Sequence, residues 1–254
     1  MVESTAVVSL RGVHCAIEDF SILHDIDLEV YPGEVVGLIG PGGHGKSVLL
    51  KLIAGLMKAS SGRIQVLGQD VVGASDLQLA QIRAATGYLF QNYALFDFMT
   101  VAENVAFPLQ QLGAASTDEI ERRVLDLLSE VGLASSLELY PRELSGGMKK
   151  RVGLARAVIT HPELSLYDDP TAGLDPVTSS KIFKLIARIQ SREDKPTSIV
   201  VSHDIDRMKV VCQRYVMLYK GRIIFDGPEE AIKDAGGMVS QFFYGATASG
   251  EDVQ

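Results

Sequence analysis

Short runs of apolar residues recur along the chain and predict buried strands. Residues 35–39 (VVGLI), 164–167 (LSLY) and 198–202 (SIVVS) are such runs. Residues 26–30 (IDLEV) alternate between apolar and acidic positions instead, which is typical of a strand at the edge of a sheet. Residues 63–68 form a further predicted strand that ends at a glycine. The pattern therefore predicts a sheet with buried strands and a more exposed edge.

Other segments repeat their apolar positions with the period of a helix. In residues 116–131 one face is apolar and the opposite face carries many charges. Residues 48–54, closed by Gly55, and residues 146–160 and 177–191 are also predicted helices. The apolar face of the segment 116–131 consists of Ile120, Val124, Leu127, Leu128 and Val131.

Strands and helices alternate at both ends of the chain, whereas its middle third is mostly helical. Residues 216–218 and 223–225 flank a Lys220-Gly221 turn and predict a β-hairpin. This order predicts an α/β fold class in which a core carries a helical lobe. Residues 246–254 are small and polar, so we expect a flexible tail there.

Composition and charge narrow the possible functions. The 254 residues are enough for one large domain or two small lobes, and 46% of them are hydrophobic. The net charge of −8 argues against a primary role on nucleic acid, which requires a basic face. Cys15 and Cys212 are far apart and are expected to be reduced thiols. We find no secretory signal and no run of about 18 apolar residues, so any work at a membrane is expected from its aqueous side.

A glycine-rich segment, GPGGHGKS, lies between the strand at 35–39 and the helix at 48–54. It matches G-x-x-x-x-G-K-[ST] in full, and its backbone N–H groups and the helix N-terminus are suited to phosphate oxygens. Lys46 supplies a cation for the β- and γ-phosphates, and Ser47 supplies a hydroxyl ligand for Mg²⁺. We therefore predict that the chain binds ATP with Mg²⁺ and hydrolyses it, with His44 facing solvent and taking no catalytic role. The predicted nucleotide contacts are Gly40, Pro41, Gly42, Gly43, His44, Gly45, Lys46, Ser47 and Val48.

Two acids follow the predicted strand at 164–167. A buried strand that ends in an acid places a carboxylate beside the phosphate loop, where Asp168 is expected to hold Mg²⁺ through water. Asp169 is then placed to polarise the attacking water. Two such acids alone would more often form a solvated turn, and the phosphate loop is what favours the functional interpretation.

Further short motifs resemble those of the ATP-binding cassette (ABC) ATPases. Residues 144–148 (LSGGM) resemble the signature motif, and residues 173–175 (GLD) resemble the D-loop. Gln91 resembles the Q-loop glutamine and His203 the switch histidine. Each motif is weak by itself, but together they occur in the family's order, and the resemblance covers about residues 8–244.

The resemblance to ABC ATPases implies an ABC-type nucleotide-binding domain at residues 1–245. It would have a RecA-like P-loop core at about 1–90 and 162–228, an antiparallel β edge, and a helical subdomain at about 91–161. Two copies would face head to tail, and the signature motif of one copy would complete the ATP site of the other. The implied catalytic residues are Asp169, His203 and Gln91, the implied metal-side residues are Ser47, Gln91 and Asp168, and the implied contacts from the second copy are Ser145 and Gly147.

Three segments resemble, more closely, the ATPases paired with MCE-domain lipid transporters, which include the Mla phospholipid system. These are residues 94–109, 146–151 (GGMKKR) and 241–245 (QFFYG). In that family the first segment forms the groove that receives the permease's coupling helix. The resemblance implies a homodimeric ATPase that energises lipid transport and lies peripherally on the cytoplasmic side of the inner membrane. Its implied partners are an integral membrane permease and an MCE-domain lipid-binding protein, with no nucleic acid.

Two alternative functions stay open at this point. The ATPase of a small-solute importer, for an amino acid for example, would have the same fold and chemistry and would differ only in its permease contacts. A soluble ABC protein of translation or DNA repair is disfavoured, because this chain has one cassette, no heptad run and an acidic balance.

Three positions depart from the ABC pattern. Asp169 stands where Glu is usual, and its shorter side chain predicts slow hydrolysis. Val48 stands where Thr usually contacts the α-phosphate, so only the backbone N–H can serve there. Ile17 aligns with the aromatic residue that stacks on adenine, and Phe20 is the candidate substitute. We therefore expect ATP binding with weak discrimination against GTP.

Overall fold

The computed structural model describes residues 5–113, 115–193 and 195–245, and these residues form two sheets. The larger sheet has the strand order β10-β9-β3-β8-β7-β6, and the smaller has the order β2-β1-β4-β5. Strands β9, β3, β8, β7 and β6 run parallel, whereas β10 and the smaller sheet are antiparallel. The strands are β1 (Val8–Ile17), β2 (Phe20–Val30), β3 (Val35–Ile39), β4 (Ser61–Val66), β5 (Gln69–Asp70), β6 (Thr86–Leu89), β7 (Leu164–Asp168), β8 (Thr197–Val201), β9 (Arg214–Tyr219) and β10 (Arg222–Pro228).

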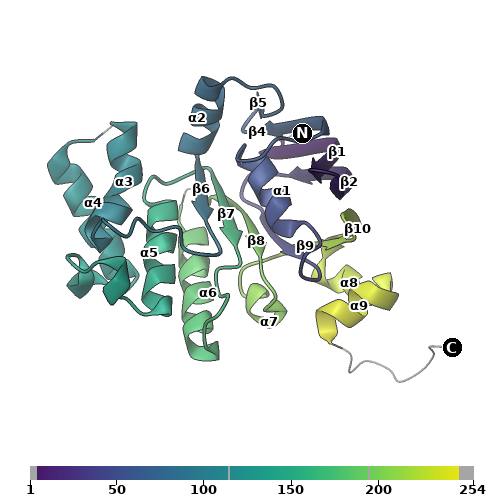
Figure 1. Ribbon diagram of the computed structural model, residues 1–254. Coiled ribbons are helices and arrows are strands. Elements are labelled where there is room, and N and C mark those ends of the chain that lie inside the picture. Colours follow the sequence, from purple (N-terminus) through teal and green to yellow (C-terminus); the bar gives the residue numbers. More distant parts are fainter. Residues whose placement is uncertain (1–4, 114, 194, 246–254) are drawn as a thin grey trace.

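Helices surround the larger sheet, and the pair α3 and α4 stands at one end of the molecule, away from the smaller sheet (Figure 1). Two short 3₁₀ helices, η1 (Ala134–Ser136) and η2 (Pro141–Glu143), follow α4. The α-helices are α1 (Lys46–Ile53), α2 (Asp76–Ala84), α3 (Val101–Leu112), α4 (Thr117–Glu130), α5 (Gly146–Val158), α6 (Pro176–Gln190), α7 (Ile205–Met208), α8 (Glu229–Ala235) and α9 (Gly237–Tyr244).

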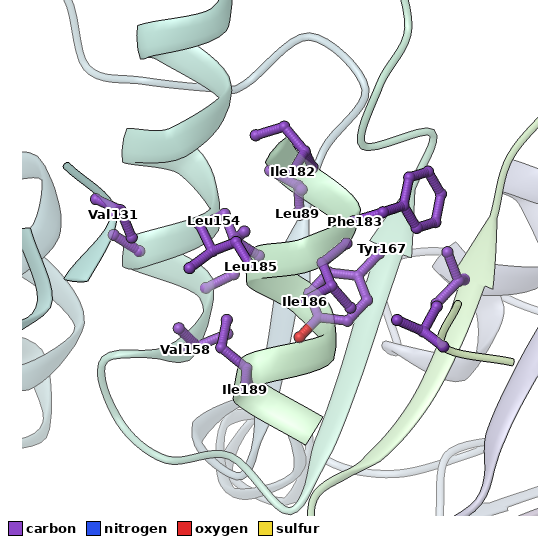
Figure 2. Packing of buried hydrophobic residues seen from close by; sticks show 14 of the residues in the cluster. Leu89, Val131, Leu154, Val158, Tyr167, Ile182, Phe183, Leu185, Ile186 and Ile189 are labelled. Carbon is purple, nitrogen blue, oxygen red and sulfur yellow. The ribbon is translucent and has the colours of Figure 1, made fainter. Parts of the chain in front are cut away.

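The central strands separate two hydrophobic clusters. In β3, Val35 and Ile39 belong to one cluster while Val36 and Leu38 belong to the other, because successive side chains of a strand point to opposite faces. One cluster packs against α3 to α6, and the other against α1 and the smaller sheet. Figure 2 shows side chains of α5 and α6 gathered beside Tyr167 of β7. Burial on both faces explains why these strands are continuous apolar runs.

Polar side chains mark the starts of the major helices. Ser116 accepts a hydrogen bond from the N–H of Glu119 and caps α4. Asp175 accepts from the N–H groups of Val177 and Thr178 and caps α6. The predicted helices at 116–131 and 177–191 are therefore present, each with bounds within one residue of the prediction.

The strand order decides where the candidate site lies. Because β3, β8, β7 and β6 are parallel neighbours, their carboxyl ends meet at one edge of the sheet. The glycine-rich loop follows β3, His203 follows β8, Asp169 follows β7 and Gln91 follows β6. Ligands of open α/β sheets bind outside the carboxyl ends of the strands, so the topology gathers these groups at a binding edge.

The sequence pattern does not predict every element. The pattern gives only the second half of β2, at 26–30. The elements that it omits are β1, β5, β6, α2, α3, α7, α8, α9 and both 3₁₀ helices. The β-hairpin is present as β9 and β10. The predicted tail at 246–254 lies outside the described residues. In the part of the chain that the structure describes, every helix is too short or too polar to cross a membrane.

Candidate functional site

The glycine-rich loop curls around the side chain of Lys46. The Lys46 ammonium donates to the carbonyls of Gly40 and Pro41, each at 2.7 Å. Gly40 has φ of 137°, and a Cβ there would lie 2.1 Å from the carbonyl oxygen of Leu218, so only glycine fits. Burial lowers the pKa of Lys46, and the nearby Asp169 and Asp168 oppose that shift. The loop thus holds a cation at the N-terminus of α1, where phosphate oxygens are favoured.

Ser47 and Asp168, the two predicted magnesium groups, are in direct contact. The Ser47 hydroxyl donates to Oδ1 of Asp168 at 2.7 Å, and Asp168 is buried at the end of β7. The Tyr88 hydroxyl donates to the other carboxylate oxygen at 3.4 Å. A hydroxyl and a carboxylate side by side are oxygen donors of the kind Mg²⁺ prefers when it also keeps several waters. The residues present therefore fit the ion.

Asp169 lies beside this pair in an unusual backbone conformation. Its φ is 49°, in the left-handed region, and its N–H donates to the carbonyl of Val201 at 3.0 Å. Burial raises the pKa of the Asp169 carboxyl, while His203 and Lys150 lower it. The group is thus a partly buried carboxylate near His203 and Lys150, which is an environment that tunes acid–base groups.

The predicted site residues from four separate segments share one cleft. Its volume is about 350 Å³. Besides Val201, it is lined by Ile22, Gly42, Gly43, Gly45, Lys46, Ser47, Val48, Gln91, Asp168, Asp169 and His203. A basic phosphate loop therefore faces carboxylates, an amide and an imidazole across a single space.

His44 is half-buried, and it makes a contact that the prediction of a solvent-facing side chain does not include. Nδ1 of His44 accepts a hydrogen bond from the N–H of Lys220 at 3.1 Å. Its ring lies 5.0 Å from that of Tyr219, centroid to centroid. The sequence could not show this contact, because 176 residues separate the partners. His44 therefore fastens the phosphate loop to the β9–β10 turn.

The signature segment lies apart from this cleft. Ser145 caps α5, and its hydroxyl accepts from the N–H of Met148 at 3.3 Å. Gly147 lies against α6, where an added Cβ would be 2.7 Å from Cγ2 of Thr178. Neither residue is among the described residues that line the cleft. Within one copy, the fold does not bring Ser145 and Gly147 to the phosphate loop.

The two positions considered for adenine stacking flank the β1–β2 turn. Ile17 and Phe20 are paired across this turn, and their exposed fractions are 42% and 74%. Ile22 lines the cleft, and Phe20 precedes it by two residues on the same strand, so both side chains point to the same face. Phe20 is not among the described residues that line the cleft, and it is the exposed aromatic residue of this strand on the same face as Ile22.

Replacing Phe20 with Ala is expected to weaken ATP affinity by about fivefold, because base stacking on an aromatic ring contributes about 1 kcal/mol or more. Equilibrium binding of ATP measures this. Phe20→Tyr, which keeps the ring, should bind ATP as the wild type does. An affinity that Phe20→Ala leaves unchanged would show that Phe20 does not contact the base.

The fold and the cleft define a P-loop nucleotide-binding domain. Residues 23–172 match the family model described as ABC transporter. The matched region contains the phosphate loop, Gln91, the signature segment and both acids. The chain belongs to the ABC transporter family, as the motif order indicates.

Curated relatives of this chain include methionine import ATP-binding proteins. MetN 2 of Pseudomonas entomophila is 42% identical over 210 residues, which are 83% of this chain and 62% of the relative. MetN of Carboxydothermus hydrogenoformans is 40% identical over 203 residues, which are 80% of this chain and 60% of the relative. The chain thus spans about three fifths of the length of these relatives.

Solved ABC structures share most of this architecture. The dimeric ATP-binding cassette MJ0796, in a post-hydrolysis state with ADP and Pi, has a TM-score of 0.81 at 32% identity and covers 87% of this chain and 98% of its own. The protein cbiO1 from Clostridium perfringens, part of the transporter complex cbiONQ, has a TM-score of 0.80 at 30% identity and covers 91% and 92%. The predicted α/β fold, with its antiparallel sheet and helical part, is confirmed.

Sequence reasoning omits three residues that shape the cleft. Ile22 lines it, Tyr88 contacts Asp168, and Lys150 lies near Asp169. Lys150 could have been found from the sequence, because it is a lysine on an otherwise apolar helix face. The positions of Ile22 and Tyr88 depend on strand pairing across the fold, which short motifs do not show.

Proposed function

We propose that this chain is the ATP-hydrolysing subunit of an ABC importer for a small solute. The observation that carries the ATPase assignment is the single cleft shared by Lys46, Ser47, Asp168, Asp169 and His203. Identity of 40–42% to methionine import ATP-binding proteins supports the importer class over other ABC functions. Methionine itself is the first solute to test.

Each polar side chain of the cleft has its own proposed role in hydrolysis. Lys46 and the loop N–H groups bind and orient the phosphates, since they lie in the cleft at the N-terminal end of α1. Ser47, Asp168 and Gln91 would hold Mg²⁺, which when bound neutralises phosphate charge. Asp169 accepts hydrogen bonds from the attacking water and takes its proton. His203, exposed beyond β8, contributes a donor to the γ-phosphate.

A second copy completes each site. Ser145 and Gly147 lie at the N-terminus of α5, a position suited to a phosphate group, yet they lie outside their own cleft. A head-to-tail pair would place them over the γ-phosphate of the partner. The dimeric form of MJ0796 with ADP and Pi supports this arrangement.

A groove of about 860 Å³ between β6, α3 and α5 is the proposed permease contact. Phe96, Phe107 and Pro108 provide apolar lining, and Arg83 and Arg156 provide charge. Phe90 lines the groove, and its neighbour Gln91 lines the cleft. A helix bound in the groove would therefore change the position of Gln91 directly. Such docking would keep the chain peripheral, on the cytoplasmic face of the inner membrane.

Lipid transport is the second candidate. The segment 94–109, which contributes Phe96, Phe107 and Pro108 to the groove, resembles the ATPases paired with MCE-domain proteins. The importer assignment predicts a permease and a solute-binding protein as partners. The lipid assignment predicts a permease and an MCE-domain protein.

Purification of the tagged full chain from native membranes separates the two candidates. An integral permease together with a solute-binding protein is the expected result. An MCE-domain protein in place of the solute-binding protein would establish the second candidate. Recovery without any integral membrane protein would contradict both.

Replacing Asp169 with Glu is expected to raise ATP turnover by up to about tenfold, because a carboxylate misplaced by about 1 Å loses much of its effect. The residue's left-handed φ of 49° suits Asp better than Glu, so the gain is reduced by backbone strain. Phosphate release at saturating ATP measures the change. An unchanged or lower turnover would show that side-chain reach does not limit hydrolysis.

A further inference from the structure

Lys150 is a buried lysine that the proposed hydrolysis does not use. It lies on α5 and has an exposed fraction of 0%. Its ammonium donates to the carbonyl of Gln91 at 2.6 Å and to the carbonyl of Asp169 at 3.0 Å. It also lies 4.9 Å from the centroid of the Tyr93 ring. One ammonium group therefore joins the backbones of two loops that line the cleft.

The electrostatic cost of this position is large. Burial lowers the pKa of Lys150 to about 8, and the negative charges of Asp169 and Asp168 raise it. Lysine is almost never fully buried unless it is paired, and an apolar side chain would fill the same space without desolvating a charge. The hydrogen bonds that Lys150 makes are what distinguish it from such a side chain.

Near its C-terminal end, helix α5 also contacts the segment 91–94. Tyr93 and Ala94 have φ of 63° and 49°, which side chains with a Cβ seldom adopt. Arg156 donates to their carbonyls at 2.8 and 2.7 Å. Between the two cations, Gly153 lies beside this segment, and an added Cβ there would make an ordinary contact of 3.5 Å with the Tyr93 carbonyl oxygen. The segment is thus fixed by α5 over its whole length.

The backbone of Asp169 is held by hydrogen bonds on both sides of its α-carbon. Its N–H donates to Val201 of β8, and its carbonyl accepts from Lys150. The N–H of Ala172 also donates to that carbonyl, at 3.2 Å. Because φ of Asp169 is left-handed, these bonds decide the direction in which its carboxylate leaves the chain.

We infer that Lys150 is a positioning residue for hydrolysis, whose two hydrogen bonds hold Gln91 and Asp169 at a fixed distance from one another. The inference rests on the proposed roles of those two residues. It adds that the carboxylate and the glutamine are aligned through α5, the helix that carries the signature segment at its N-terminus. Lys150 is not among the described residues that line the cleft.

Two substitutions that match each other in length, both one atom shorter than lysine, separate hydrogen bonding from packing. Lys150→Met keeps an unbranched side chain without a donor, whereas Lys150→Gln keeps N–H donors without the charge. In the full chain, Lys150→Met is expected to lower kcat about tenfold, because a displacement of Gln91 and Asp169 of less than about 1 Å weakens their action in the transition state. Lys150→Gln should keep kcat within about threefold of the wild type. ATP affinity, from equilibrium binding, should stay within about twofold in both.

Lys184→Met, on the exposed side of α6, is the matched control and should behave as the wild type. Equal kcat values for folded Lys150→Met and Lys150→Gln would overturn the inference, as would a parallel loss of kcat and ATP affinity. Thermal melting reports folding. If Lys150→Met does not fold, Lys150→Gln decides: a kcat within threefold supports the inference, and a tenfold loss overturns it. A wild type without ATPase activity would contradict the proposed function instead.

Discussion

Replacing Asp169 with Asn is expected to reduce ATP turnover by about 100-fold or more, because a positioned general base contributes that much and an amide cannot accept the proton. ATP binding should be retained, since the phosphates are held by the loop around Lys46. Asn tolerates the left-handed φ of 49° as well as Asp does, so the backbone should not move. Phosphate release and equilibrium ATP binding, measured on the same protein, separate the two effects.

The control for this substitution is Asp126→Asn, which makes the same chemical change on the exposed face of α4. Its turnover should equal that of the wild type. An Asp169→Asn protein that hydrolyses ATP at a comparable rate would show that another group activates the water. His203 would then be the next candidate, because it lines the same cleft.

Replacing Ser145 with Arg is expected to reduce turnover by about 100-fold or more, since it removes donors aimed at developing phosphate charge and fills their place. The ATP affinity of an isolated copy should not change, because Ser145 lies outside that copy's cleft. The combination of normal binding and lost turnover is specific to a residue that acts on a partner's nucleotide. The measurements are the same as for Asp169→Asn.

Ser116→Arg is the matched control for the loss of a helix cap. Ser116 caps α4 with the same 3.3 Å hydrogen bond that Ser145 makes at α5. Either substitution should cost about 1 kcal/mol of stability from the cap. Only Ser145→Arg should lose turnover. Equal losses in both variants would mean that capping, and not the nucleotide, explains the effect.

Local patterns predict the central part of the fold and the cleft well. Residues 35–39 are an apolar run followed by a glycine loop and a helix, and this order places Lys46 and Ser47 at the end of β3. Residues 164–167 are a second such run, which places Asp168 at the end of β7. Because parallel strands align their carboxyl ends, the two runs place Ser47 and Asp168 at the same edge of the sheet, and the strand order β3-β8-β7 brings them into contact.

Features that depend on distant pairings are not predictable in this way. Strand β1 pairs with both β2 and β4, and its alternation is irregular because bulges interrupt the register. The contact of His44 with Lys220 joins the phosphate loop to a turn far along the chain. The left-handed conformation of Asp169 depends on hydrogen bonds from Lys150 and to Val201. None of these has a local sequence signal.

The central claim is that two copies share each ATP site, and a mixture of two inactive variants tests it most directly. Lys46→Ala removes the phosphate-loop cation, and Ser145→Arg removes the signature contact. In a mixed head-to-tail dimer one site carries both changes and the other carries neither. Mixing equal amounts should therefore restore about a quarter of the wild-type turnover, because about half of the dimers are mixed and each has one intact site. A mixture that stays as inactive as its components would contradict a shared site.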